Sequence, residues 1–174
     1  ELVGRIEAAN TFLKTAGNTQ PVALTQSILT QRKKAMQELA ALSPALFLQH
    51  TLSPDAIRAL SREFRSEVET PVTLTGTLDV LIRDDLETFG HSGVEYAFKV
   101  NGERVALYST RNLDTRSGGT WRVEGVRLGD ILVADGKTVR ATALPPALDS
   151  VGEQKTLILL LDYANSTPSP FSAA

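Results

Sequence analysis

The stretch that decides the fold is Pro71-Val72-Thr73-Leu74-Thr75-Gly76-Thr77-Leu78-Asp79-Val80-Leu81-Ile82-Arg83. Apolar side chains alternate in it with threonine and charged side chains, and this period of two is typical of a strand with one buried face. Gly76 stands in the middle of the run, where a bulge or a tight bend is expected. A strand that is long and bent can serve two edges of a barrel, because its two halves can pair with different neighbours.

Shorter alternating segments follow this strand. They lie at residues 94–100, around Val105 and Leu107, and at residues 121–126, 131–133 and 139–141. Asn101-Gly102 is the strongest hairpin signal between them, because both turn positions require positive φ. Five or six antiparallel strands predict a small closed β-barrel of the oligonucleotide/oligosaccharide-binding (OB) type over residues 71–146, with the usual helix after the third strand reduced to a loop. A two-sheet sandwich is the competing architecture, but the long first strand favours the barrel.

The residues before Pro71 have a helical pattern instead. Apolar side chains recur at steps of three and four from Leu24 to Leu42, so this run has one buried face. We expect the basic run Arg32-Lys33-Lys34 to lie on the solvated face. Pro44 ends the helix, because the residue before a proline avoids the helical region.

Two further helices complete this segment, residues 1–70. One is expected over residues 2–14. The other begins at Ser53-Pro54-Asp55, where a serine cap is followed by a proline and an acid in the first turn. Its expected buried face is Ile57, Leu60, Phe64 and Val68. The predicted fold class of the chain is therefore α+β, a helical segment followed by the OB-like barrel and a C-terminal strand.

That last strand falls in residues 147–174. The run Leu157-Ile158-Leu159-Leu160-Leu161 follows Lys155-Thr156 and precedes Asp162. Five consecutive apolar residues are typical of a strand that is buried on both faces, and such a strand needs covering layers on both sides. We therefore expect it, after a linker, either to be the entry strand of a following domain or to dock onto the domain before it.

The composition disfavours several classes of function. The 174 residues carry a formal net charge of −2, whereas nucleic-acid sites need a clustered surplus of lysine and arginine. No stretch approaches the roughly 20 apolar residues of a membrane span. We therefore expect no nucleic-acid and no membrane partner. The sequence has no cysteine, which excludes disulfides, cysteine-ligated zinc and thiol nucleophiles.

Residues that could carry chemistry are few. Asp84, Asp85, Glu87 and His91 lie in one polar loop and are the candidate metal cluster, although a solvated acidic loop is the simpler interpretation of this spacing. There is no nucleophile elbow, zinc-binding helix motif, Walker loop or dinucleotide fingerprint. The sequence therefore predicts that this chain is not an enzyme and holds no cofactor.

The strand alternation separates the aromatic residues of the barrel into two groups. The inward group is Tyr96, Phe98 and Trp121. These side chains share a face with the aliphatic residues, so they are expected to fill the core and not to stack on nucleobases. Tyr108 falls outside, beside Arg104 and near Arg122. These three residues are the candidate ligand face, for a carbohydrate or a peptide.

A resemblance to a known family rests on a series of ordered motifs. They are Arg32-Lys33-Lys34-Ala35-Met36-Gln37-Glu38-Leu39, Pro44-Ala45-Leu46-Phe47-Leu48, Leu52-Ser53-Pro54-Asp55-Ala56-Ile57-Arg58, Val68-Glu69, Gly76-Thr77-Leu78-Asp79-Val80-Leu81, Asp84-Asp85-Leu86-Glu87, Val123-Glu124-Gly125-Val126-Arg127-Leu128-Gly129-Asp130 and Gly152-Glu153-Gln154-Lys155-Thr156-Leu157. Over residues 31–161 the chain resembles the N-terminal region that precedes the catalytic domain in bacterial secreted precursors similar to gametolysin-type zinc metallopeptidases.

The resemblance implies a secreted, non-catalytic pro-region whose partner is the downstream catalytic domain of the same precursor. Such a region would cover the active-site cleft or assist folding, and residues 157–161 would form the first strand of the protease domain. If one group reaches the zinc, the candidates for this latch are Asp84, Asp85, Glu87 and His91. A binding module for carbohydrate or peptide and a structural spacer are the alternatives.

Overall fold

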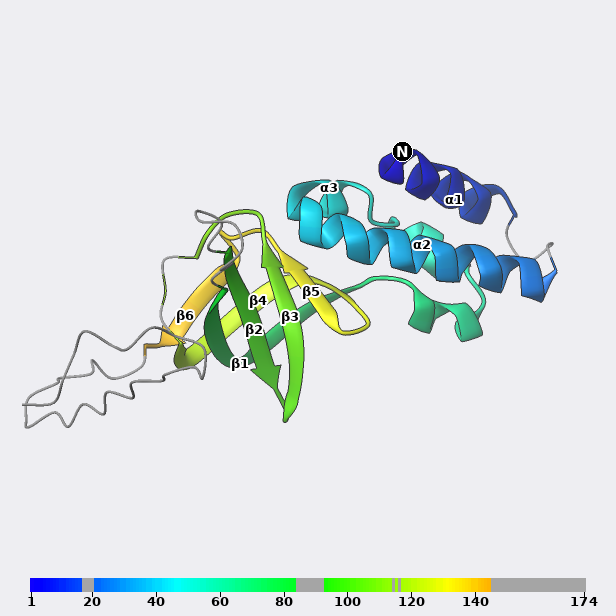
Figure 1. Cartoon of the computed structure of the whole chain (residues 1–174). Coiled ribbons are helices and arrows are strands. Elements are labelled where there is room, and N and C mark those ends of the chain that lie inside the picture. Colours follow the sequence, from blue (N-terminus) through cyan, green and yellow to red (C-terminus); the bar gives the residue numbers. More distant parts are fainter. Residues whose placement is uncertain (17–20, 84–92, 114, 116, 145–174) are drawn as a thin grey trace, which may run out of the picture.

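The computed structural model describes residues 1–16, 21–83, 93–113, 115 and 117–144, so the strand predicted at residues 157–161 lies outside the described residues. The helical elements are α1 (Leu2–Ala16), α2 (Val22–Leu42), α3 (Pro44–Gln49), α4 (Pro54–Ala59) and the 3₁₀ helix η2 (Arg62–Glu67). The strands are β1 (Thr70–Arg83), β2 (Gly93–Val100), β3 (Glu103–Ser109), β4 (Gly118–Leu128), β5 (Ile131–Ala134) and β6 (Val139–Ala143). Figure 1 shows the helices beside a β-barrel, which confirms the predicted α+β class.

β1 pairs with two different strands. Residues 70–78 pair with β4 and residues 77–83 pair with β2, so the strand passes from one partner to the other near its middle. Gly76 permits this close approach, because a Cβ atom there would lie 2.0 Å from the carbonyl oxygen of Lys99. The register with β4 shifts directly afterwards, between Thr77 and Leu78. The predicted irregularity in the middle of this strand is thus confirmed.

The barrel closes in the order β1-β2-β3-β5-β4, and β4 returns to β1. β3 and β5 run parallel, whereas the other neighbours are antiparallel. The barrel is therefore mixed and not wholly antiparallel as predicted, because strand directions cannot alternate all the way around a closed ring of five. β6 lies outside the ring and pairs with the first half of β4. This architecture is consistent with the predicted OB-like barrel.

The barrel core is apolar. Its buried members are Leu78, Tyr96, Phe98, Val100, Val105, Leu107, Trp121, Val123, Leu132, Ala134 and Val139. The polar atoms of the two amphipathic aromatics reach backbone partners: the Tyr96 hydroxyl accepts from the Leu113 amide at 2.9 Å, and Trp121 Nε1 donates to the Gly118 carbonyl at 3.1 Å. The prediction that Tyr96, Phe98 and Trp121 fill the core is confirmed.

β5 joins the barrel to the helical segment. All four of its residues are buried. Leu132 and Ala134 point into the barrel core, while Ile131 and Val133 belong to a second cluster with Met36 and Leu39 of α2 and Phe47 of α3. A strand with both faces buried needs cover on both sides, and the helices supply the outer one. The two regions therefore pack as one folded unit.

The helix ends differ in part from the predicted ones. α2 ends at Leu42 as expected, but Pro44 also begins α3, whose cap is Ser43. Ser53 caps α4 as predicted, and its hydroxyl accepts from the Ala56 amide at 3.3 Å. α4 stops at Ala59 because Leu60 has extended backbone angles (φ −71°, ψ 145°). The rest of the predicted buried face then continues through η2.

Candidate functional site

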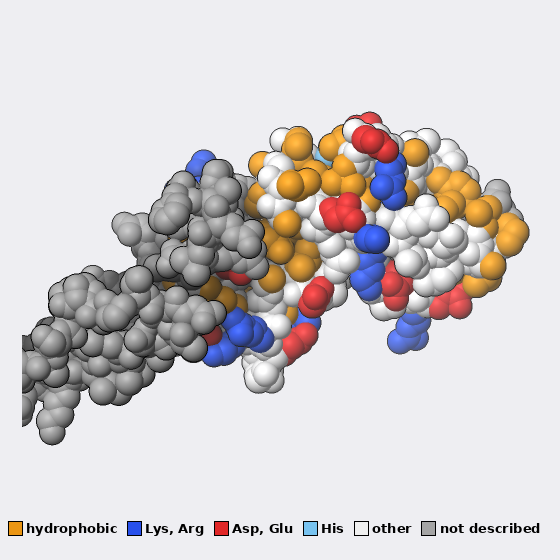
Figure 2. Space-filling model, viewed as in Figure 1, with side chains coloured by type: hydrophobic (Ala, Val, Ile, Leu, Met, Phe, Trp, Pro, Cys, Tyr) orange, Lys and Arg blue, Asp and Glu red, His pale blue; other side chains and the backbone are white. Residues whose placement is uncertain are grey.

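A groove lies over the outer face of the barrel, where β2 and β3 stand beside the corner between α2 and α3. Its volume is about 860 Å³. The lining includes Leu81, Val94, Ala97, Arg104, Ala106 and Tyr108 on the barrel and Ala41 and Pro44 at the helical corner. Figure 2 shows hydrophobic side chains gathered where the barrel meets α3 and the end of α2. Strands two and three form a usual ligand face in OB folds, so this groove is the candidate site.

The groove has a shallow apolar floor. Ala97 of β2 and Ala106 of β3 are direct cross-strand partners. Ala97 is buried and Ala106 is exposed, so the small side chain of Ala106 allows a ligand to approach the sheet closely. Leu81 lies on the same face as Ala97 and extends this floor, whereas Val94 lines the end of the groove. They are 40% and 47% exposed although both are large and apolar. Exposed apolar groups that line one groove indicate a surface for a partner with apolar side chains.

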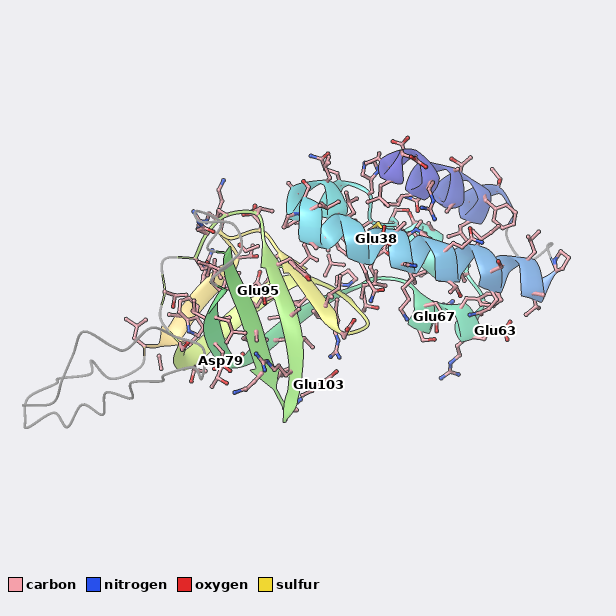
Figure 3. All side chains as sticks on the ribbon, viewed as in Figure 1. Glu38, Glu63, Glu67, Asp79, Glu95 and Glu103 are labelled. Carbon is pink, nitrogen blue, oxygen red and sulfur yellow. The ribbon has the colours of Figure 1, made fainter. Side chains whose placement is uncertain are left out.

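The charged groups around the groove are engaged, with one exception. Asp130 accepts a hydrogen bond from Gln37 at 3.0 Å, and Arg111 donates one to the Gly136 carbonyl at 2.9 Å. Glu95, which Figure 3 labels on β2, also has an interaction partner. Arg104 is exposed and has neither a hydrogen bond nor an ion pair with any residue that the structure describes. Its guanidinium is therefore the cation available to a ligand carboxylate.

Tyr108 lies between the helices and the groove. Its ring is half-buried and packs against the cluster between helices and barrel, while the side chain also lines the groove. Within the described part of the chain, its hydroxyl has no hydrogen-bond partner. A phenol hydroxyl of this kind can donate to an oxygen of a bound peptide or sugar.

The structure brings together two of the three residues of the predicted ligand face. Arg104 and Tyr108 line the same groove, but Arg122 does not. Arg122 lies on β4 opposite Thr75 of β1, and its guanidinium is 3.3 Å from the carboxylate of Glu124. Around the ring, β5 separates β4 from β3 on one side, and β1 and β2 separate them on the other. The alternation within one strand does not show how the strands are ordered around the barrel, so the sequence could not separate Arg122 from the other two residues.

The predicted latch residues Asp84, Asp85, Glu87 and His91 lie outside the described residues. In the described ranges, no group of three or more histidine, cysteine, aspartate or glutamate side chains is arranged to hold a metal ion.

The sequence interpretation missed a buried ion pair. Arg32 and Glu69 are 2% and 1% exposed, and both guanidinium nitrogens Nη1 and Nη2 donate to the carboxylate at 2.6 Å. Arg32 Nε also donates to Asn10 at 2.5 Å, and Glu69 accepts from the Leu52 amide. This corrects the expectation that Arg32 lies on a solvated face. A signal was available, because Arg32 is three residues after the buried Leu29 and therefore lies on the apolar stripe.

The comparisons add no relative: no protein-family model, no curated protein and no solved structure matches this chain. Among the described helices, none combines the length and the hydropathy that a membrane span requires.

Proposed function

We propose that this chain is a non-catalytic region that binds a polypeptide segment of its own secreted precursor and thereby covers or helps to fold a metallopeptidase-like catalytic domain. The observation that carries the proposal is the groove, with its apolar floor of Ala97 and Ala106 and its unpaired Arg104. A partly apolar groove with one available cation suits an extended peptide better than a nucleic acid, whose binding requires a clustered basic surface.

The way the helices meet the barrel supports this proposal. α2 and α3 cover the outer face of β5 and leave Arg104 and Ala106 on the adjacent outer face of β3 exposed, so the helical corner at Ala41 and Pro44 becomes the second wall of the groove. A wall on each side can cover both faces of an extended segment, which a bare barrel surface cannot do.

The test is to add the purified chain in trans to the catalytic domain of the same precursor. We expect a lower peptidase activity, or a higher yield of active enzyme on refolding, at micromolar excess. Ala106→Trp fills the groove floor and should abolish the effect, whereas Thr75→Trp, on another exposed part of the barrel, should preserve it. If neither activity nor refolding yield changes, the proposal is wrong.

A second candidate function is the recognition of a carbohydrate or a free peptide through Tyr108. The Tyr108 hydroxyl and the Arg104 guanidinium are both available within the same groove, and this favours it. Tyr108→Phe removes the hydroxyl and keeps the ring that packs against the helices. In a screen of glycans and peptides, a true ligand should bind this variant more weakly, whereas the covering or folding effect should not depend on the hydroxyl.

A further inference from the structure

We infer that the occupant of this groove is the chain's own segment Thr156-Leu157-Ile158-Leu159-Leu160-Leu161-Asp162, held against β2 and β3 with the Asp162 carboxylate on Arg104. This inference rests on the proposed function, and it names the polypeptide segment that the groove binds. The sequence left two expectations for this segment, the entry strand of a following domain or a strand that docks onto the preceding domain. The inference favours the second.

The first argument is the match between the two faces of the segment and the two walls of the groove. In an extended conformation Leu157, Leu159 and Leu161 lie on one face, and Ile158 and Leu160 lie on the other. A strand that is apolar on both faces requires cover on both sides. The groove offers the barrel face on one side and the helical corner, Ala41 and Pro44, on the other.

The second argument is charge. The apolar run is followed directly by Asp162. The groove contains one charged side chain without a partner in the described structure, Arg104, and an arginine–carboxylate pair can form two parallel hydrogen bonds. A segment with apolar side chains and one adjacent carboxylate therefore satisfies both features of the groove.

The third argument is reach. The strand registers connect the end of β6 to Arg104 through one row of cross-strand partners, Ala143–Thr120–Thr77–Lys99–Arg104. Four strand spacings of about 4.8 Å make a path of roughly 19 Å over the surface. About 18 residues lie between Ala143 and Asp162, the residue held on Arg104, and an extended chain of that length spans about 60 Å. The tether is long enough to go around intervening side chains.

The test is disulfide trapping in the full chain, which has no cysteine of its own. One variant carries Ala106→Cys on the groove floor and Leu159→Cys in the segment. Its matched control carries Thr75→Cys, an exposed position on β1, with the same Leu159→Cys. Thr75 is fewer strands away from β6 than Ala106 is, so an undirected tether would reach it more easily.

We expect the intramolecular disulfide to form about 10-fold faster with Ala106→Cys than with Thr75→Cys, because docking raises the effective concentration at the groove. Arg104→Asp should remove this preference, and the added change Asp162→Arg should restore it. Ser109→Cys, also on the groove lining, serves as a second trap if Ala106→Cys does not fold.

Equal rates of disulfide formation at the groove and the control positions would overturn the inference. A preference for the groove that stays the same in the Arg104→Asp variant would also overturn it. These outcomes differ from a failure of the proposed function. If trapping fails while the chain still acts on the catalytic domain in trans, the groove binds another segment. If trapping succeeds and the chain has no effect in trans, the trans experiment is repeated with the Asp162→Arg variant, whose groove the segment no longer fills. If this variant also has no effect, the docked segment remains but the proposed role is wrong.

Discussion

The helical segment and the barrel are stabilised in different ways. The barrel has an apolar core, and its backbone is satisfied by strand pairing around a closed ring. The helical segment contains a fully buried ion pair between Arg32 of α2 and Glu69, and the pair also makes hydrogen bonds to α1 and to the segment after α3. In the barrel, backbone hydrogen bonds connect neighbouring strands. In the helical segment, side-chain hydrogen bonds of a buried polar network connect elements that have no backbone bonds to each other.

Helix lengths explain the need for such a network. α3 and α4 have six residues each, and helices of this length are not stable alone. Arg32 on α2 links Asn10 of α1 and the His50 carbonyl after α3 to Glu69, which directly precedes β1. No buried side-chain nitrogen or oxygen in the described residues lacks a hydrogen-bond partner. The network is therefore complete, and its loss should be costly.

The largest expected effect tests this network. Glu69→Ala leaves the Arg32 charge buried without its partner, and we expect a loss of about 3–5 kcal/mol in the free energy of unfolding. Urea unfolding should be followed by circular dichroism for the helices and by fluorescence for the barrel, whose Trp121 is the single tryptophan. We expect the helical signal to be lost at lower urea than the tryptophan signal.

The matched control is Glu67→Ala. Glu67 pairs with Lys33 at 3.0 Å, but both side chains are partly exposed, so the expected loss is at most about 1 kcal/mol. If both variants lost the same unfolding free energy, the buried Arg32–Glu69 pair would stabilise the helical segment no more than an exposed pair does. The proposed difference between the helical segment and the barrel would then be wrong. Replacing both partners with apolar residues, Arg32→Met with Glu69→Leu, should recover only part of the stability, because no unpaired charge remains but the Leu52 amide and the Asn10 Oδ1 atom still lose their partners.

A smaller effect is expected from the backbone of the barrel. Gly76→Ala places a Cβ atom against the Lys99 carbonyl and should cost about 1–3 kcal/mol, because two paired strands must separate. Gly4→Ala in α1 meets no atom within 4 Å and should instead stabilise the chain by about 0.5–1 kcal/mol. The urea midpoint should therefore fall in Gly76→Ala and rise in Gly4→Ala, which would show that the barrel depends on a close backbone contact and that α1 does not. A destabilising Gly4→Ala would contradict it.

The smallest effect concerns pH and the turn between β5 and β6. The Lys137 amide donates to the Asp135 carboxylate at 3.0 Å and lowers the pKa of this exposed acid. A lowered folded-state pKa contributes stability above the ordinary value of about 3.9 and loses it as the pH falls through the lowered pKa. Asp135→Asn should thus be slightly less stable than the wild type near neutral pH, with the difference disappearing in acid. A difference that does not change with pH would contradict this.

Local patterns predicted much of the fold. The alternation around Gly76 predicted β1, Ser53-Pro54 predicted the start of α4, and Asn101-Gly102 predicted a hairpin whose two residues have φ of 51° and 81°. Each of these signals acts between residues that are close in sequence, through backbone sterics or through the period of buried side chains. The inward aromatics were predictable for the same reason.

The candidate site was predictable only in part. Strand alternation placed Arg104 and Tyr108 on an outer face, and they do share the groove. It also grouped Arg122 with them, because alternation assigns a face but not a position around the barrel. No sequence pattern predicted that Ala41 and Pro44 form a wall of the groove, since this depends on where the helices pack against the barrel.

By itself, the sequence determined the period of the long elements, the start of α4, the hairpin turn at Asn101-Gly102 and the inward aromatic side chains of the barrel, because these depend on neighbours along the chain. The tertiary structure alone decided that β3 and β5 run parallel, that Glu69 is the partner of Arg32, and that the helical corner makes one wall of a groove. These are contacts between distant residues, and their formation depends on how the whole chain closes and packs.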